Sequence, residues 1–244
     1  MTLYFIGIGL NDAKDISVKG LEIVKNCEKV YLENYTSVLN CKISELEKLY
    51  GKKIVLADRD MVEKNAENTI LKDAKGKNTA FLVVGDVFGA TTHIDLMMRA
   101  RELNIETKTI HNASVLTAVG ITGLELYKFG KVTSIPFENG NVKSPIEALK
   151  NNQKIGLHTL FLLDLNPEEN KFLSINNAVT YLIKNKVSKD TMAVACCALG
   201  SEAPILKYST FENLQKTSFN KFPQCLIIPG KLHFMEEKAL ELLK

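Results

Sequence analysis

The chain has 244 residues, which is enough for one large domain or for two of about 120 residues each. Hydrophobic residues make up 45% and charged residues 24%, values that are ordinary for a soluble globular protein. The formal net charge is only +3, and no basic stripe is interleaved with aromatic residues, which argues against nucleic acid as a partner.

Cysteine usage and the N-terminus indicate the compartment. The chain has five cysteines, and none forms a C-x-x-C pair, so we expect reduced thiols and a cytoplasmic setting. The opening residues, MTLYFIGIGL, carry no basic leader, and no apolar run approaches ~18 residues, so we expect neither a signal peptide nor a membrane span. The four histidines are isolated from one another in the sequence, and we expect no metal site.

Strand-like and helix-like segments alternate through the first half of the chain. Apolar strands that alternate with helices are typical of a mostly parallel α/β sheet. In the first expected helix the apolar face consists of Val18, Leu21, Ile23 and Val24, and Gly51 is expected to end the second. The expected strands are 3–6, 29–33, 52–57, 79–84 and 106–110, and the expected helices are 17–27, 42–51, about 61–75 and 92–104.

The second half contains more strands at closer spacing, which favours a mixed sheet. Ser174 is a plausible N-cap for the first of its two helices. We place the seam between two α/β domains near "HNAS", which gives an N-terminal domain over 1–110 and a C-terminal domain over 111–244. The expected strands are 130–137, 156–165, 191–199, 205–210 and 225–230, and the expected helices are 174–185 and 233–244.

Three loops follow strands of the first domain, where α/β proteins bind ligands. They read "GIGL" (7–10), "GDVFGATTH" (85–93) and "HNAS" (111–114). In the second loop the carboxylate of Asp86 could accept hydrogen bonds from a ribose or an ammonium group. Each loop also has a purely structural interpretation: a glycine turn that packs a helix on the sheet, or a helix cap provided by Asp86, Thr91, Thr92 or Ser114.

Known phosphate and catalytic motifs do not match these loops. The first lacks the third glycine of the dinucleotide fingerprint, and the second lacks the Gly-Lys-Ser/Thr of a nucleoside-triphosphate loop. The residues suggest no nucleophile–base constellation and no acid–base pair of carboxylates. The catalytic residues are therefore unknown at this stage, and the pattern favours a protein that holds and positions a cofactor.

Several segments in order along the chain carry a family resemblance. They are "LYFIGIGL", "DISVKGLEIV", "YLENYTSVL", "GDVFGATTH", "HNAS", "AVGITGLELYKFGK", "GLHTLFLLDL" and "PGKLH". Together they cover nearly the whole chain, and "YTSVL", "GATTH" and "LYKFGK" are specific. The chain resembles the diphthine synthases, also called diphthine methyl ester synthases, which are tetrapyrrole-methylase-like methyltransferases.

The resemblance implies a fold, a reaction and partners. It implies two α/β domains, with a mostly parallel sheet in the first, a mixed sheet in the second, and S-adenosylmethionine in the cleft between them. It implies a homodimer whose protein substrate is translation elongation factor 2, at a histidine that carries a 3-amino-3-carboxypropyl group. The amine receives three methyl groups, and eukaryotic members also esterify the carboxylate. "ENYTSVL", "FGATTH" and "HNAS" look closer to the eukaryotic branch, which favours the methyl ester product.

The resemblance also implies the cofactor contacts. Matching positions carry S-adenosylmethionine, and its product S-adenosylhomocysteine, onto residues of both domains. The implied contacts are Leu10, Asp86, Gly89, Ser114, Val115 and Leu163, together with Leu199 and Gln224, whose surroundings differ more from the family pattern.

The chain departs from the family pattern at several points. Val87 replaces a proline, Ala198 replaces an arginine, a Trp-x-Pro element is missing after "SIPF", and the region after Asp164 is short. These departures affect the expected substrate handling more than the fold. They leave two alternatives: a methyltransferase of the same fold that acts on a tetrapyrrole or RNA, and a non-catalytic cofactor-binding scaffold.

Overall fold

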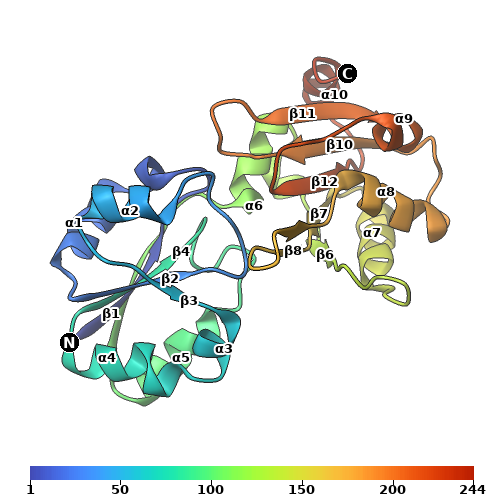
Figure 1. Cartoon of the computed structure of the whole chain (residues 1–244). Coiled ribbons are helices and arrows are strands. Elements are labelled where there is room, and N and C mark those ends of the chain that lie inside the picture. Colours follow the sequence, from blue (N-terminus) through green and yellow to red (C-terminus); the bar gives the residue numbers. More distant parts are fainter. The chain divides into compact units, whose positions relative to one another are not determined.

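A computed structural model describes residues 1–244, which form two compact units (Figure 1). The first unit comprises Met1–Leu116 with the short segment Asn166–Glu169, and the second comprises Thr117–Leu165 with Asn170–Lys244. The main division therefore falls after residue 116 rather than after residue 110, and a few residues of the second half of the chain join the first unit.

The first unit is built on a five-stranded sheet in the order β3-β2-β4-β1-β5. All of its strand pairs are parallel, which confirms the expected parallel sheet. The register places Phe5 opposite Phe81 on β4 and opposite Thr109 on β5, so β1 lies between these two strands. The strands are β1 (Thr2–Gly7), β2 (Lys29–Glu33), β3 (Val55–Ala57), β4 (Thr79–Val83) and β5 (Glu106–Ile110).

Helices cover both faces of this sheet (Figure 1). Successive side chains of a strand point to opposite faces, and in β1 Phe5 packs in one buried cluster while Ile6 packs in the other. The cluster around Phe5 includes α3, α4 and α5, and the cluster around Ile6 includes α1 and α2. The helices are α1 (Val18–Asn26), α2 (Ile43–Tyr50), α3 (Arg59–Glu63), α4 (Ile70–Gly76), α5 (Ile94–Glu102) and α6 (Val115–Ala118), with 3₁₀ turns at Ala13–Asp15 and Ala66–Asn68.

Two expectations for this unit were wrong. The helix expected over about 61–75 is divided into α3 and α4 by a 3₁₀ turn, and Thr69 leaves the helical region at φ −124° and ψ −96°. The Thr69 hydroxyl donates a hydrogen bond to the Asn65 carbonyl, the kind of local bond by which such residues compete with a continuous helix. In α1, Val18 is exposed and does not belong to the buried face, whereas Val24 does.

The second unit contains a mixed sheet in the order β11-β10-β12-β7-β6. Only β6 and β7 are parallel, and the other three pairs are antiparallel. The strands are β6 (Thr133–Ile135), β7 (Thr159–Leu163), β10 (Met192–Cys197), β11 (Ile205–Thr210) and β12 (Gln224–Ile228), and a separate two-stranded sheet joins β8 (Leu165–Asn166) to β9 (Lys171–Phe172).

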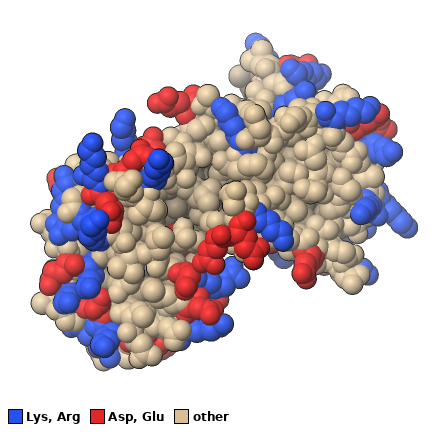
Figure 2. Space-filling view, in the orientation of Figure 1, with Lys and Arg blue, Asp and Glu red and all other residues tan.

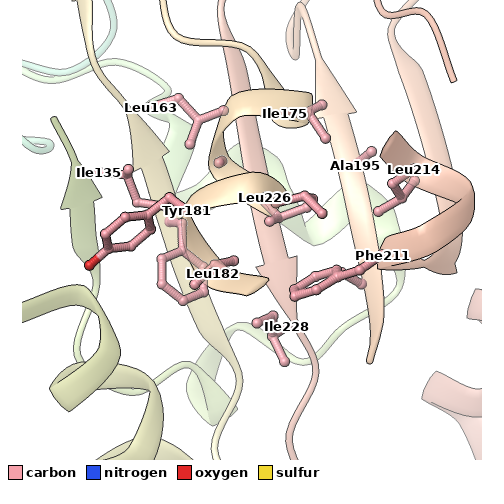
Figure 3. Close-up of a cluster of buried hydrophobic side chains, with 14 of the residues drawn as sticks. Ile135, Leu163, Ile175, Tyr181, Leu182, Ala195, Phe211, Leu214, Leu226 and Ile228 are labelled. Atoms are coloured by element: carbon pink, nitrogen blue, oxygen red, sulfur yellow. The ribbon is translucent and has the colours of Figure 1, made fainter. Parts of the chain in front are cut away.

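One face of this mixed sheet packs against α8 and α9 (Figure 3). Leu226 and Ala195 from neighbouring strands lie under Leu182 of α8 and Leu214 of α9. Ser174 caps α8 as expected, because its hydroxyl accepts a hydrogen bond from the Asn177 N–H. The helices are α7 (Ser144–Lys154), α8 (Ile175–Lys184), α9 (Phe211–Lys216) and α10 (Phe234–Glu241), with 3₁₀ turns at Val119–Thr122 and Leu126–Lys128.

Two further features are the lengths of the helices and the distribution of charged side chains on the surface. No helix has both the length and the apolar character needed to cross a bilayer. On the face shown in Figure 2, basic and acidic side chains of the first unit are interspersed, with no continuous basic stripe.

A buried carboxylate links three segments of the second unit. Glu236 at the start of α10 has no exposed surface, and it bonds to Lys128 and, at 2.8 Å, to His158 Nε2. It also accepts hydrogen bonds from the backbone N–H groups of Glu125 and His233. Burial alone would raise the pKa of Glu236, but these bonds, led by that from Lys128, lower it to about 2.

We expect this carboxylate to make the stability of the protein depend on pH. A lowered pKa stabilises the folded state fully above pH 4.5, and the contribution disappears as the pH falls toward 2. The shift corresponds to about 3 kcal/mol of unfolding free energy. Chemical denaturation between pH 2 and pH 6 should show that Glu236→Gln is less stable at pH 6 and that its deficit shrinks as the pH falls. An equal deficit at every pH would contradict this role.

Candidate functional site

Three loops meet at one edge of the first unit's sheet. Strands β4, β1 and β5 are adjacent and parallel, so the loops after their carboxyl ends lie side by side. The loop after β1 is tied to the loop after β4 by two backbone hydrogen bonds, from Gly85 N to Gly9 O at 2.7 Å and from Gly9 N to Gly85 O at 3.3 Å. The "GIGL", "GDVFGATTH" and "HNAS" loops therefore form one edge site, as the strand order requires.

Two glycines permit other close contacts at this edge. Gly9 has a φ of +81°, and a Cβ there would lie 2.3 Å from the Cβ of Asp15. A Cβ on Gly89 would lie 2.6 Å from the Cβ of Ser114. Gly89 thus allows the loop after β4 to contact the residue that precedes α6. Its missing side chain serves packing between loops, and only its backbone remains available to a ligand.

Asp86 connects the loop after β4 to the loop after β5. Its Oδ1 accepts a hydrogen bond from the Phe88 N–H at 3.0 Å, and its Oδ2 accepts one from the Asn112 N–H at 3.0 Å. His111 Nδ1 lies 2.9 Å from the same Oδ2. Burial would raise the pKa of Asp86, but these hydrogen bonds lower it, so the group is ionised at neutral pH.

The Asp86 carboxylate still has capacity for a ligand. An ionised carboxylate offers about four acceptor positions, two on each oxygen. Two are used on Oδ2 and one on Oδ1, so one position on Oδ1 remains for a donor such as a ribose hydroxyl. The structural interpretation of the motif is therefore confirmed for Asp86, and the carboxylate keeps the capacity that the ligand-binding interpretation requires.

Three further residues shape this edge, and the sequence analysis did not single them out. Asp15 Oδ2 accepts hydrogen bonds from the N–H groups of Leu10 and Asn11, which fixes the "GIGL" turn. The Asn112 side-chain amide donates to the carbonyls of Gly7 and Asp15, each at 3.0 Å. His111 completes the group through Asp86. All three lie within segments that carry the family resemblance. That resemblance is the one feature of the sequence that could have identified them as residues of the site.

The end of the "GDVFGATTH" loop differs from the expected cap. Neither threonine caps α5, because the N-cap is His93 and it makes no side-chain capping bond. The Thr91 hydroxyl instead donates to the Val87 carbonyl within the loop. The Val87 side chain is fully buried in the core beside α5, so the residue that replaces the family's proline anchors the loop.

The remaining expected contacts belong to the second unit, at one end of its sheet. Leu163 ends β7, Gln224 begins β12, and Leu199 follows β10, whose last residue, Cys197, pairs with Gln224. The Gln224 amide is engaged within the protein: it accepts from the Ile175 N–H at 2.8 Å and donates to the carbonyls of Phe219 and Lys221. Next to Leu199, Ala198 has a left-handed φ of 50°, a strained conformation of the kind found at ligand sites.

The loops of the first unit's edge site enclose Gly85. The space on the side-chain side of Gly85 is bounded by Leu10, the Ala113 carbonyl and Ser114, at 3.6 to 3.9 Å from where a Cβ would stand. Val115 opens α6 directly after Ser114. Leu10, Asp86, Gly89 and Ser114 are thus brought together, with one free acceptor position on Asp86, which suits a nucleoside.

Comparisons with a family model, with curated relatives and with solved structures all indicate the same family. The family model described as Tetrapyrrole (Corrin/Porphyrin) Methylases matches residues 2–214. A "Probable diphthine methyl ester synthase" of Arabidopsis thaliana is 43% identical over 99% of this chain and 98% of its own length. A "Diphthine synthase" of Methanosarcina barkeri is 41% identical over 98% and 94%. A crystal structure of diphthine synthase superposes with a TM-score of 0.94 at 39% identity, covering 100% of this chain and 96% of the other.

We expect Asp86 to be needed for the stability of the edge as well as for binding. Asp86→Ala leaves the Phe88 and Asn112 N–H groups without their acceptor, which should lower the unfolding free energy by about 1–3 kcal/mol. His111→Ala removes only a largely exposed partner and should cost far less. Urea denaturation of both variants tests this. Equal losses would mean that the carboxylate does not hold the two loops together.

Proposed function

Because this chain belongs to the tetrapyrrole methylase family, and within it to the diphthine synthases, we propose that it methylates the modified histidine of translation elongation factor 2 with S-adenosylmethionine as donor. The observation that carries the proposal is the near-complete coverage of both chains at 41–43% identity. The protein is a methyltransferase. The donor, the acceptor and the number of methyl groups are the proposed part.

The proposed donor site comprises the residues at the ends of the strands. We assign the contacts of S-adenosylmethionine, and of S-adenosylhomocysteine after transfer, to Leu10, Asp86, Gly89, Ser114, Val115, Leu163, Leu199 and Gln224. The donor supplies an electrophilic methyl group on a sulfonium. The free acceptor position on Asp86 Oδ1 supports the first-unit part of this assignment, since it matches a ribose hydroxyl. For Gln224 only backbone contact is proposed, because its amide is engaged elsewhere.

The chain's main contribution to the reaction is alignment. A carboxylate acceptor is already nucleophilic at neutral pH, and an amine needs only to lose a proton, which solvent can accept. Holding donor and acceptor in line can account for about 7–11 kcal/mol of the barrier. This explains why a methyltransferase can function without a nucleophile–base pair in its sequence, and we assign no catalytic residue.

We favour the methyl ester as product, which requires four methyl transfers. The support comes from "ENYTSVL", "FGATTH" and "HNAS", which look closer to eukaryotic members. Overall identity does not separate the branches, because the Arabidopsis thaliana relative named for the methyl ester is 43% identical and the Methanosarcina barkeri relative named for diphthine is 41% identical.

We further propose that the protein is a cytoplasmic homodimer. Its five cysteines are free, which suits a reducing compartment. In the second unit, two exposed aromatic side chains belong to segments that Glu236 joins, namely α10 and residues 125–128. Tyr127 is 82% exposed and Phe234 is 66% exposed, so both aromatic rings are accessible to a second copy of the chain.

The reaction is tested by mass spectrometry of the acceptor. Elongation factor 2 that carries the 3-amino-3-carboxypropyl group, incubated with the protein and S-adenosylmethionine, should gain four methyl groups. A gain of three would replace the methyl ester by diphthine, and no gain would contradict the proposal. Calorimetric titration with S-adenosylhomocysteine, with NAD as the control ligand, shows whether a failure concerns the donor or the acceptor.

The dimer is tested by light scattering coupled to gel filtration. Tyr127→Glu, combined with Phe234→Glu, should convert a dimer of the 27.2 kDa chain into a monomer, because it places charge in a desolvated contact. Val18→Glu is the matched control, since Val18 is an exposed apolar residue of the first unit. A dimer that survives the double substitution would show that this surface is not the interface.

A further inference from the structure

A pocket lies on the same edge of the first unit's sheet. It has a volume of about 330 Å³, and its lining includes Tyr35, Val62, Glu63, His93, Asp95 and Leu96. Tyr35 follows β2, the α3 residues Val62 and Glu63 follow β3, and the others begin α5 after the loop from β4. The loop 85–93 therefore begins among the contacts of Asp86 and ends in this pocket.

The pocket wall contains polar groups without partners. The Tyr35 hydroxyl and both ring nitrogens of His93 are buried and have no hydrogen-bond partner. Tyr35 is 7% exposed and His93 is 1% exposed. The large majority of buried polar side-chain atoms are hydrogen-bonded, and an unmet group carries a desolvation penalty. The unmet ring nitrogens of His93 point to a ligand that can bond to one of them, and the Tyr35 hydroxyl adds to the polar character of the wall.

The carboxylate of Glu33 lies next to His93. His93 Nε2 lies 3.7 Å from Glu33 Oε2, and neither side chain has exposed surface. Burial alone would raise the pKa of Glu33, but His93 and the hydrogen bonds from Thr36 and Tyr35 lower it, so Glu33 is ionised. Nε2 is the ring nitrogen that faces this carboxylate, so Nδ1, which also has no partner, is the nitrogen left for a ligand that donates an N–H.

The charges around the pocket favour a cation. No lysine or arginine belongs to the lining, whereas Glu63 and Asp95 do. Two guanidinium groups pair with these carboxylates: Arg59 is 3.8 Å from Glu63, and Arg99 is 3.2 Å from Asp95. Arg99 also forms an ion pair with Glu67, at 2.6 Å. When Glu33 is counted, the carboxylates in and around the pocket outnumber the guanidinium groups.

The uncharged part of the wall suits methyl groups. Val62 and Leu96 are apolar, and the Tyr35 ring is an aromatic surface that already has the Arg59 guanidinium 5.3 Å from its centroid. Aromatic rings with nearby carboxylates are the usual recognition surface for ammonium groups that carry methyl groups. The pocket thus offers an acceptor for N–H, a negative field, and apolar contacts in one place.

We propose that this pocket receives the amino group of the acceptor side chain, first as an ammonium and then in its methylated forms. In the early forms an N–H donates to His93 Nδ1, and in the later forms the methyl groups contact Tyr35, Val62 and Leu96. The proposal rests on the proposed function for the identity of the acceptor. It adds a site for the reacting nitrogen and makes Tyr35, Glu63, His93 and Asp95 positioning residues for the acceptor.

The test separates the pocket from the donor site. Glu63→Gln combined with Asp95→Asn removes both charges from exposed positions and should raise the KM for elongation factor 2 about tenfold, with kcat and S-adenosylhomocysteine affinity unchanged. Glu67→Gln is the matched control, because Glu67 also binds Arg99 but lies outside the pocket, and its KM should stay within about twofold. An unchanged KM in the double variant, or an equal loss of S-adenosylhomocysteine affinity, would overturn the proposal.

A direct binding measurement keeps the pocket testable if turnover fails. Tetramethylammonium chloride should shift the His93 imidazole resonances in the NMR spectrum of the full-length protein, and tert-butanol, a neutral group of similar shape, should not. Tyr35→Phe should keep this response because the ring remains, whereas Tyr35→Leu should lose it. The same response to both compounds, or to neither, would refute the pocket. If the protein shows the tetramethylammonium-specific response but transfers no methyl group, only the identity of the acceptor is refuted.

Discussion

The hydrogen bonds to the Asp86 carboxylate are the interaction on which the edge site of the first unit depends. Parallel strands bring the ends of β4, β1 and β5 to one side of the sheet, but they do not fix the loops that follow. Asp86 joins the loop after β4 to the loop after β5, and Asn112 then joins that loop to the end of β1. One acceptor position on Asp86 remains for a ligand.

The loop 85–93 divides this edge into two regions with different chemistry. Its first part lies among glycines and backbone hydrogen bonds, which suits a nucleoside. Its last residue, His93, lies in a pocket with an aromatic ring and carboxylates, which suits a methylated ammonium. Buried Val87 fixes the loop between these regions. A methyltransferase needs a donor site and an acceptor site in a fixed relation, and under our two proposals this single anchored loop contributes residues to both sites.

Much of the fold follows from local sequence, but the contacts of the site do not. The alternation of apolar strands and helices predicts the parallel sheet, Ser174 predicts the start of α8, and Gly51 ends α2 at a left-handed φ of 67°. The break between α3 and α4 depends on a turn of Asn and Thr residues that periodicity does not register. Asn112 bonds to Gly7 across 105 positions, so its role requires the strand order.

The family resemblance predicts more of the site residues than the residue patterns do, and the reason is physical. The segments that carry it include the residues whose side chains hold the loops, namely Asp15, Asp86, His111 and Asn112. It does not reveal how each residue is used. Gln224 is expected at the cofactor, and the structure adds that its amide holds the start of α8. The pocket of Tyr35 and His93 becomes visible only when the ends of β2, β3 and β4 are placed together.

The central claim is that the edge formed by β4, β1 and β5 binds the donor. Hydrogen–deuterium exchange of the full-length protein, with and without S-adenosylhomocysteine, tests it most directly because it reports each loop separately. We predict slower exchange in residues 7–10, 85–89 and 111–115 when the ligand is bound, with little change in residues 59–63 of the neighbouring pocket. Protection confined to other segments, or unchanged exchange at saturating ligand, would contradict the account.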